Sequence, residues 1–525
     1  MKNNRPNFLF ITTDYQRGVD LPSYGSPFLK MPNVDRLCRE GAVFTNHIST
    51  TPICMPARAC WMTGQYPHTH GLWDNRDCEW FRTTPTLMEQ FHDLGYHNIC
   101  VGKLHAGPSA DHRNPRGFDT RIECYSKDGC PPDGDDYERF IEKSGWSRKQ
   151  IKEFRGVHNI QPGNAVYDWP LDEKLFFDNY IADQALELIN GGEIDGKDNW
   201  FFWLSFCGPH NPWTAPGRCT APYRQMKNLP LGNYREGELM TNPIDFTRHR
   251  YCYGESMWEV YDYLSPPEQE DLRRRVRAGH YGNLTLIDER IGDVLSALAA
   301  QNQLENTIII FASDHGSSLF DNGLLHKGTH FDESVRVPFI VHNPKFAAPG
   351  VRKNFTTHVD FLPTMISLAG GDIPPAVEGV DLTPMLKDPQ ASVQEFAVME
   401  CTLATAIITD EWRMSVNHFN GDSDLYDIKS DPHSFENLSG RSEYAEIEKS
   451  LRQKLVQWRR KLSPGKNIPE NVFEWRECLG PSEYVAHFRE SYLNQYRRLA
   501  KLDPEKRPGR VGKYMQAFLD RIESN

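Results

Sequence analysis

The sequence predicts an α/β protein in which helices cover both faces of a large, mixed but mainly parallel sheet. The first observation is that short apolar runs alternate with segments of helical periodicity over the first three quarters of the 525 residues, as βαβ units require. The second is a change after Pro389 to short strand-like runs and a helical segment. That change predicts a smaller α+β subdomain towards the C-terminus.

The elements of the larger part follow in chain order. Strands are predicted at 8–13, 98–102, 200–206, 307–313 and 337–342, and helices at 33–40, 86–94, 175–188, 277–298 and 361–368. Polar residues follow four of these strands, namely Asp14, Lys103, His210 and Asp314. Because ligands in such sheets bind beyond the carboxyl ends of the strands, we expect these four side chains to meet at one edge.

The chain divides into three predicted parts. They are a catalytic domain at 1–388, a subdomain with a short antiparallel sheet and a helix at 389–463, and a helical tail at 464–525. Two segments rich in Pro, Gly, Trp and Tyr, 127–163 and 215–264, are interpreted as insertions that shape a substrate pocket. The tail is expected to pack on its own subunit or to form a contact in a homo-oligomer.

Composition excludes several classes of partner. The formal charge of −12 argues against nucleic acid, because phosphate binding requires a basic face. No apolar run is long enough to cross a bilayer, and the chain opens without a secretory leader. The 12 cysteines include no Cys-x-x-Cys pair, so reduced thiols in the cytoplasm are expected. A periplasmic location is the alternative if a leader has been removed from the sequence.

The most informative motif is Cys54-Met55-Pro56-Ala57-Arg58. Pro56 suits the first turn of a helix, which places Cys54 near the N-cap, where free amides and the helix dipole favour an anion. Arg58 then lies about one turn further on the same face, where its planar fork suits a tetrahedral oxyanion. Taken alone, the motif favours a simpler interpretation, which is a buried structural cysteine before a helix.

The motif resembles the C-x-P-x-R signal of the type I sulfatases in the alkaline phosphatase superfamily, in which the cysteine is oxidised to formylglycine. Ala57 stands where the commonest form of the signal has serine. The resemblance implies an alkaline phosphatase-like fold and a formylglycine-generating enzyme as a partner during maturation. It implies that Cys54 is the precursor of the nucleophile in a sulfuric ester hydrolase that acts on an organic sulfate monoester.

Lysines and histidines after later strands extend the resemblance. They are Lys103 and His105 in Gly102-Lys103-Leu104-His105, His210 in Pro209-His210-Asn211, and Lys327 in His326-Lys327-Gly328. Each alone is more simply a surface or structural residue, whereas together they follow the order of the family. The resemblance implies that Arg58 and the two lysines neutralise the sulfate oxygens as charge builds. It implies that His210 protonates the leaving alcohol and that His105 accepts a proton from the nucleophile, although these two roles are exchangeable.

A metal site is predicted at the same edge of the sheet. The candidate ligands are Asp14 at the end of the first strand and Asp314 and His315 after a later one. Oxygen ligands with a single histidine suit a hard cation better than zinc, so calcium is expected, with magnesium or manganese as alternatives. The resemblance implies that converted Cys54 is a fourth ligand and that an acidic or amide ligand follows the first aspartate. This chain has Tyr15 there, and Gln16 is a candidate substitute.

Residues just after the nucleophile helix are candidates for substrate binding, namely Trp73, Asn75 and Arg76. The polar pair can bind a sugar hydroxyl or carboxylate, and aromatic residues can stack on a sugar face. For Trp73, simple core packing is an equal alternative. We expect a sulfated carbohydrate rather than a simple aryl sulfate.

Two other functions are open. A phosphonate monoester or phosphodiester hydrolase of the same superfamily resembles this chain at the cysteine, arginine and metal positions. Those enzymes tend to carry Tyr and Thr where this chain has Lys103 and His105, which favours sulfate. A non-catalytic, metal-stabilised binding protein that kept the fold is the other alternative. Mass spectrometry of the peptide that contains Cys54 discriminates it, because an unmodified thiol would support a binding protein.

Overall fold

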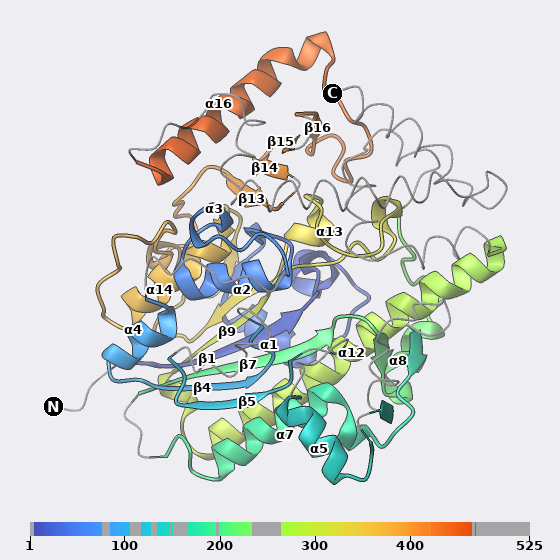
Figure 1. Ribbon diagram of the computed structural model, residues 1–525, viewed down its shortest axis with the longest axis vertical. Coiled ribbons are helices and arrows are strands. Elements are labelled where there is room, and N and C mark those ends of the chain that lie inside the picture. Colours follow the sequence, from blue (N-terminus) through green and yellow to red (C-terminus); the bar gives the residue numbers. More distant parts are fainter. Residues whose placement is uncertain are drawn as a thin grey trace.

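The computed structural model describes residues 5–75, 85–105, 117–125, 127, 134–147, 149–150, 166–195, 199–233, 264–402, 404–418, 421–464 and 468. Figure 1 shows a large sheet between two layers of helices, with a smaller sheet and one long helix at the other end of the molecule. Over these residues, none of the helices combines the length and the apolarity that a membrane crossing needs.

The main sheet has eight described strands in the order β11-β2-β10-β9-β1-β7-β4-β5. Their bounds in that order are Gly350–Arg352, Ala42–Phe44, Phe339–His342, Thr307–Ser313, Asn7–Asp14, Trp200–Pro209, His97–Gly102 and Thr120–Glu123. β10 runs antiparallel to both neighbours, while the other pairs are parallel. The predicted large mixed sheet is confirmed, and the five predicted strands correspond to β1, β4, β7, β9 and β10.

Burial of β1 on both faces explains why the sequence identifies it. All of its residues are buried, and a strand covered on both sides reads as one continuous apolar run. Successive side chains point to opposite faces, so Phe8 and Phe10 join one hydrophobic core while Leu9 and Ile11 join the other. Each fully buried side chain of this size contributes about 1.5–3 kcal/mol.

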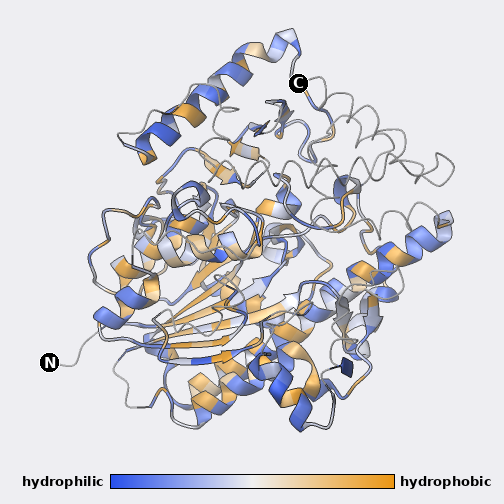
Figure 2. Cartoon of the chain, in the orientation of Figure 1, coloured by the Kyte–Doolittle hydropathy of each residue, from blue (hydrophilic) through white to orange (hydrophobic). Residues whose placement is uncertain are grey.

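The helices form the two outer layers. Leu9 and Ile11 face α1 (Pro32–Glu40), α7 (Phe177–Asn190) and α12 (Pro266–Ala300), and Phe8 and Phe10 face α2 (Cys54–Thr63), α4 (Leu87–Asp93) and α14 (Phe361–Leu368). Figure 2 shows the central strands in the colours of hydrophobic residues. The helix predicted at 277–298 begins earlier than expected, because Ser265 and Glu268 form a capping box ahead of it.

Shorter elements complete the larger part. The helices are α3 (Pro67–His70), α5 (Asp136–Lys143), α8 (Gly217–Arg224), α13 (Asp332–Val335) and α15 (Thr383–Lys387), and the strand pairs are β3 (His47–Ile48) with β12 (Thr356–Thr357) and β6 (Val166–Asp168) with β8 (Trp213–Ala215). Its 3-10 turns are η1 (Gly18–Asp20), η2 (Pro22–Tyr24), η4 (Glu173–Leu175), η5 (Leu304–Asn306), η6 (Asp321–Gly323) and η7 (His358–Asp360), whereas η8 (Ser442–Tyr444) lies in the C-terminal part. Helices α5 and α8 lie within the segments interpreted as insertions.

The C-terminal part has the predicted antiparallel sheet and helix. Its strands are β13 (Ala397–Glu400), β14 (Ala404–Ile408), β15 (Trp412–Asn417) and β16 (Ser423–Asp427), paired in that order. Helix α16 (Ala445–Leu462) buries Leu451 and Leu455 in a hydrophobic cluster that also contains Cys60 and Tyr66 of the larger part. The domain boundary near 388 stays a prediction, and nearly all of the predicted tail lies outside the described residues.

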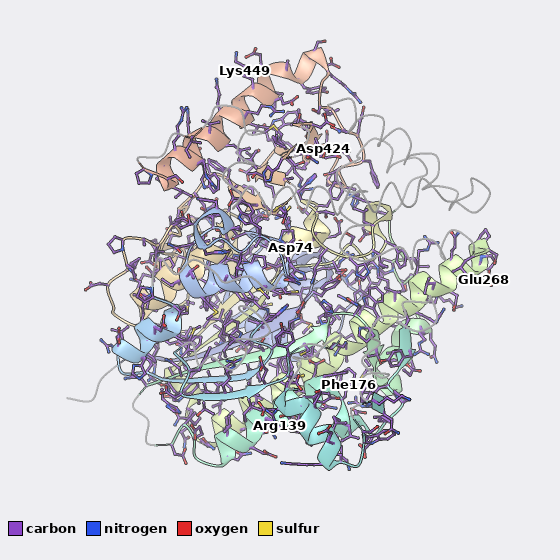
Figure 3. All side chains as sticks on the ribbon, in the orientation of Figure 1. Asp74, Arg139, Phe176, Glu268, Asp424 and Lys449 are labelled. Carbon is purple, nitrogen blue, oxygen red and sulfur yellow. The ribbon has the colours of Figure 1, made fainter. Side chains whose placement is uncertain are left out.

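Figure 3 locates the two parts by labelled side chains. Lys449 lies on the outer side of α16, and Glu268 lies at the free end of α12. Asp74 lies where the two parts meet, next to Trp73, whose carbonyl accepts a hydrogen bond from the Thr402 hydroxyl at 3.1 Å. The stretch after α3 is therefore held between the main sheet and the smaller one.

Candidate active site

Cys54 is the first residue of α2, at the carboxyl edge of the main sheet. The preceding residue supplies no side-chain cap, and the Met55 amide instead donates a hydrogen bond to Asn75 Oδ1 at 2.9 Å. The Cys54 side chain is buried, with its residue 1% exposed. The predicted position of the cysteine at a helix start is confirmed.

The surroundings of the Cys54 sulfur are cationic. Its Sγ lies 2.7 Å from Lys327 Nζ and 3.2 Å from His315 Nε2. Burial alone would raise the pKa of the Cys54 thiol, but the charges of Lys327, Lys103 and His315 lower this pKa well below its ordinary value. A site that favours a thiolate favours other anions at the same place.

Four candidate metal ligands converge at this point, namely Asp14, Cys54, Asp314 and His315. One ligand atom from each lies within 4.8 Å of all the others. His315 Nδ1 donates to the Gly316 carbonyl at 2.9 Å, because a carbonyl only accepts, so Nε2 faces the cluster. A hydrogen bond from the ring nitrogen that faces away from the metal is typical of histidines that bind a metal.

The two carboxylates are held in place by backbone amides and by Arg58. Asp314 Oδ1 accepts from the amides of Tyr15 at 3.3 Å and His315 at 2.9 Å. Asp314 Oδ2 accepts from Arg58 Nε at 3.0 Å, and Arg58 Nη2 lies 3.8 Å from Asp14 Oδ2. The guanidinium is fully buried. In this structure Arg58 faces the candidate ligands, so its predicted contact with a sulfate oxygen stays a prediction.

Lys103 reaches the site because of the glycine before it. Gly102 has a φ of 104°, and a Cβ there would lie 1.9 Å from the Ser205 carbonyl oxygen, so only glycine fits this turn. Lys103 Nζ then lies 2.5 Å from Asp14 Oδ2. Burial would raise the pKa of the Asp14 carboxyl, but the nearby cations, Lys103 foremost, hold it below its ordinary value.

Lys327 links the nucleophile position to His210. Its Nζ is 3.4 Å from His210 Nε2 and 3.1 Å from His315 Nε2, in addition to the contact with Cys54. His210 Nδ1 donates to the Asn211 carbonyl at 2.8 Å, which fixes the ring with Nε2 towards the site. The predicted meeting of Asp14, Lys103, His210 and Asp314 at one edge therefore occurs in the structure.

His105 lies beside the sulfur with a strained backbone. Its φ is 43°, in a region that residues other than glycine seldom adopt. Burial and the charge of Lys103 lower the pKa of the His105 imidazole, and its side chain hydrogen-bonds Cys54. A neutral imidazole in this position suits a proton acceptor.

Neither residue after Asp14 takes the place of a further metal ligand in this structure. The Tyr15 hydroxyl and His326 Nδ1 share a hydrogen bond of 2.8 Å. Gln16 Oε1 accepts from the Thr13 hydroxyl at 2.8 Å, and its Nε2 contacts the Met31 sulfur at 3.6 Å. The candidate substitution by Gln16 is therefore not supported, because its side chain is engaged away from the cluster.

The predicted substrate residues have different surroundings. Trp73 is 3% exposed and packs edge-on against His418, with ring centroids 6.4 Å apart, which favours the core-packing alternative. Asn75 is exposed, although its side-chain oxygen accepts from the Met55 amide at the start of α2. Arg76 lies outside the described residues.

Sequence reasoning missed Ser205 as a site residue. Its hydroxyl donates to the Lys103 carbonyl at 2.6 Å and accepts from Arg58 Nη1 at 3.0 Å. Ser205 pairs with Thr12 in β1 and with Gly102 in β4. The position of Ser205 in the site could have been predicted from the register of the strands. That register can be assigned only when the order of the strands in the sheet is known.

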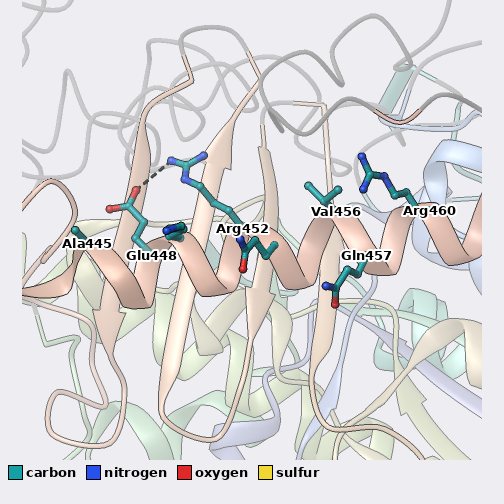
Figure 4. Close-up of a pocket in the computed structure, with 8 residues that line it drawn as sticks. Ala445, Glu448, Arg452, Val456, Gln457 and Arg460 are labelled. Carbon is teal, nitrogen blue, oxygen red and sulfur yellow. Dashed lines mark hydrogen bonds and ion pairs between the residues drawn. The ribbon is translucent and has the colours of Figure 1, made fainter.

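A separate surface groove runs along α16 and contains none of these residues. Figure 4 shows it lined by side chains of α16, among them Glu448 and Arg452, whose ion pair measures 3.1 Å. It is an ordinary feature of an amphipathic helix on the surface, and we assign the chemistry to the cluster around Cys54.

An α/β sheet between helix layers, with carboxylates and an imidazole gathered beside a cysteine at a helix start, fits the alkaline phosphatase superfamily, to which the sulfatase family belongs. The chain belongs to the sulfatase family, whose members hydrolyse sulfate esters. The sequence profile described as Sulfatase matches residues 6–371, and the one described as N-sulphoglucosamine sulphohydrolase, C-terminal, matches residues 320–461. The family typically uses formylglycine and a divalent metal, and the cluster is a candidate site for that metal.

Comparisons with individual proteins agree with the assignment to the sulfatase family. A choline-sulfatase of Rhizobium meliloti is 29% identical over 452 residues, which cover 84% of this chain and 83% of that protein. An N-acetylglucosamine-6-O-sulfatase of Bacteroides thetaiotaomicron is 25% identical and covers 86% of each. The crystal structure of the phosphonate monoester hydrolase of Agrobacterium radiobacter has a TM-score of 0.73 at 22% identity, covering 87% of this chain and 96% of that one. This last likeness supports the fold alone.

Proposed function

We propose that this protein hydrolyses the sulfate monoester of a sulfated carbohydrate to the alcohol and sulfate, with formylglycine made from Cys54 as the nucleophile. The observation that carries the proposal is the position of Cys54, which begins α2 within 4.8 Å of the candidate ligand atoms of Asp14, Asp314 and His315. Lys327 and the Asp14-bound Lys103 add positive charge at the same point.

The donor set fits a hard divalent cation, and calcium is our choice, with magnesium or manganese as alternatives. Asp14, Asp314 and His315 would hold it together with the converted Cys54. When bound, the metal supplies positive charge that activates a hydroxyl nucleophile and polarises the ester oxygens. Chelation should abolish turnover, and calcium should restore it better than magnesium or manganese. Full activity of the metal-free enzyme, checked by elemental analysis, would contradict the assignment.

Oxidation of Cys54 would give an aldehyde, and addition of water to it would supply two hydroxyls. One would attack the sulfur as the ester alcohol leaves. The second would then lose its proton, so that the carbon–oxygen bond to sulfate breaks and the aldehyde returns. Lys103 and Lys327 are placed to neutralise the oxygens of the sulfate as negative charge builds. Loss of one such donor commonly lowers kcat by about 10²- to 10³-fold.

Two imidazoles provide proton transfer on either side of the reacting atoms. His210 has Nδ1 fixed on a carbonyl, so a proton on Nε2 is directed towards the site and can pass to the leaving alcohol. His105, whose pKa is lowered, stays neutral and can accept a proton from the nucleophile side. The lowered pKa of His105 supports this assignment, and the exchanged assignment of the two histidines is the alternative.

The carbohydrate substrate is supported by the N-acetylglucosamine-6-O-sulfatase among the relatives and by the polar residues Asn75 and Arg76 after the nucleophile helix. A panel of glucosamine 6-O-sulfate, choline sulfate and an aryl sulfate tests it. The sugar sulfate should give the highest kcat/KM. A higher kcat/KM for choline sulfate would replace this substrate class with the one that the choline-sulfatase relative names.

A phosphonate monoester or phosphodiester hydrolase is the second candidate, favoured by the fold it shares with the solved phosphonate monoester hydrolase. Lys103 and His105 favour sulfate, as the sequence indicates. The test compares an aryl sulfate with the matched aryl phosphodiester, using wild type and Cys54→Ala co-expressed with the converting enzyme and supplied with calcium. We expect faster sulfate turnover that Cys54→Ala abolishes. A higher kcat/KM for the diester would assign the protein to the second candidate.

We further propose a cytoplasmic protein, since all the cysteines described in the structure have free thiols and such thiols persist in a reducing compartment. A homo-oligomer contact through the tail beyond 464 stays part of this proposal. Cell fractionation and light scattering of the full chain and of a chain ending at 464 test the two points. A periplasmic pool would reject the cytoplasmic location. The same number of subunits per particle in both chains would reject an oligomer contact through the tail.

A further inference from the structure

Tyr15 directly follows the candidate ligand Asp14 and has an unusual backbone. Its φ is 86°, a left-handed value that costs energy in any residue with a Cβ, and its side chain is fully buried. A strained, buried aromatic residue directly after a candidate metal ligand calls for an explanation beyond packing.

The Tyr15 ring lies among the ionisable groups of the site. Lys327 Nζ lies over the ring, 4.6 Å from its centroid. The rings of His210 and His315 meet it edge-on, with centroids 4.6 Å and 5.1 Å away. The face of an aromatic ring attracts an ammonium group, and this same ammonium lies 2.7 Å from Cys54 Sγ.

The ring is itself held from behind. The Tyr15 hydroxyl hydrogen-bonds His326 Nδ1 at 2.8 Å, and His326 stacks on Trp213 with ring centroids 5.3 Å apart and an interplanar angle of 26°. His326 precedes Lys327 in the chain. The hydroxyl therefore fixes the loop that carries the lysine, while the ring face fixes the lysine head group.

We propose that Tyr15 is a positioning residue that holds the Lys327 ammonium against the nucleophile without neutralising it. The inference rests on the proposed function, since it concerns the charge that meets the sulfate. A carboxylate here would pair with Lys327 and compete with the substrate for it, whereas a ring attracts the ammonium and leaves its full charge available. Among the described residues, no carboxylate forms an ion pair with Lys327.

The test is a double-mutant cycle of Tyr15→Leu and Lys327→Ala, with Tyr15→Phe as the conservative variant. Leucine also has a Cβ, so the energetic cost of the positive φ is unchanged, but the aromatic ring is lost. Tyr15→Leu should lower kcat about tenfold with little change in KM, and Tyr15→Phe, which keeps the ring, should stay within about threefold of wild type. In the Lys327→Ala background Tyr15→Leu should have almost no further effect, because both changes remove one interaction.

Controls separate this role from folding and from metal binding. Tyr96→Leu removes another buried tyrosine ring, whose hydroxyl bonds the Pro6 carbonyl at 2.9 Å, at the end of β4 opposite to Lys103. It should lower the melting temperature about as much as Tyr15→Leu and leave kcat unchanged. Bound metal per protein and conversion of Cys54, measured by elemental analysis and mass spectrometry, should be equal in wild type and Tyr15→Leu.

Inorganic sulfate binding, followed by calorimetry, repeats the cycle without turnover. Inorganic sulfate is a dianion and carries the extra charge that builds during the reaction, which the ester itself lacks. Tyr15→Leu should therefore weaken sulfate binding in the wild-type background and leave it unchanged in Lys327→Ala. Additive effects in either cycle, or loss of metal in Tyr15→Leu, would overturn the inference and make Tyr15 a packing residue or a metal ligand. If wild type binds sulfate with the expected coupling but turns over no sulfate ester, the proposed function fails while the role of Tyr15 stands.

Discussion

Two regions of the molecule bury charge in opposite ways. In the subdomain clamp, defined as His68, Glu378, Glu400 and Arg459, opposite charges are matched. His68 Nδ1 lies 2.7 Å from Glu400, its Nε2 lies 3.3 Å from Glu378, and Arg459 lies 2.8 Å from the other oxygen of Glu400. In the active-site cluster Lys327 instead meets a sulfur, imidazole nitrogens and a ring.

The difference teaches how to tell a structural cluster from a functional one. A matched buried charge is satisfied within the fold, and removing one member leaves the other unpaired at high cost. Charges gathered without a matching partner instead mark a place where a ligand supplies the missing charge. The clamp ties α16 and β13 to α3, whereas the cluster around Cys54 is arranged for an anion.

The largest expected effect breaks the functional cluster alone. Cys54→Ala should abolish sulfate ester hydrolysis, because it removes the precursor of the nucleophile, and leave the melting temperature nearly unchanged. Cys60→Ala is the matched control, since Cys60 is a buried cysteine of the same helix that contacts His70 Nε2 at 3.4 Å. That variant should keep its kcat. Equal loss of activity in both variants, measured on an aryl sulfate, would contradict the assignment.

The next effect breaks the clamp alone. Glu400→Gln removes the carboxylate shared by His68 and Arg459, and breaking such a buried pair should lower the free energy of unfolding by about 3–5 kcal/mol. The kcat of the folded enzyme should change little. Denaturant titration and active-site titration of the same samples give both quantities.

Glu411→Gln is the control for Glu400→Gln. Glu411 pairs with Lys429 at 2.8 Å on the surface, where both side chains are more than half exposed. An exposed pair contributes only about 0–1 kcal/mol. If Glu411→Gln destabilised the protein as much as Glu400→Gln, burial and matching would not be what distinguishes the clamp.

A third prediction sharpens the contrast from the side of the active site. Lys103→Ala should lower kcat by about 10²- to 10³-fold, as expected for a donor to the developing charge. It should not lower stability as Glu400→Gln does, because a metal held by Asp14 would neutralise this carboxylate. Lys449→Ala on the outer face of α16 controls for loss of a lysine. If Lys103→Ala instead lowered the free energy of unfolding strongly and left kcat unchanged, Lys103 would be a residue that stabilises the fold rather than one that acts on the substrate.

The smallest effect is the pH dependence of the clamp. Burial alone would lower the pKa of His68, but Glu400 and Glu378 raise it above its ordinary value. The stabilisation by charged His68 is therefore complete below about pH 6.5, the ordinary pKa, and is lost as the pH rises through the raised one. The difference in unfolding free energy between wild type and His68→Gln should shrink in that range, by at most about 1.4 kcal/mol per pH unit. A difference that grows with pH would show that His68 acts uncharged.

Local patterns predicted the residues that follow strands. Asp14, Lys103, His210 and Asp314 were expected at one edge because each ends a recognisable apolar run, and the parallel sheet does bring them together. The helix start at Cys54 was predictable for the same kind of reason, since Pro56 limits where a helix begins. The proposed roles of these residues are not established by their positions.

Contacts between distant segments were not predictable in this way. Trp73 is buried by His418 and Thr402, more than three hundred residues further along the chain. Arg58 lies on the predicted face of its helix, but the sequence gives no sign that Asp314 and the Lys103 carbonyl reach it first. Tyr15 was noted as a departure from the family, yet its relation to Lys327 depends on the path of a loop that no local pattern fixes.

The burial of α2 has a consequence for how the protein is made. All ten residues of this helix are buried, so the proposed oxidation of Cys54 would have to take place while the segment is still unfolded. Lys327, which covers the sulfur, is synthesised 273 residues later, a delay of roughly 14–55 s at ribosomal speeds of about 5–20 residues per second. The order of the elements along the chain would thus leave the cysteine accessible during synthesis until the loop after β9, which carries Lys327, has been made.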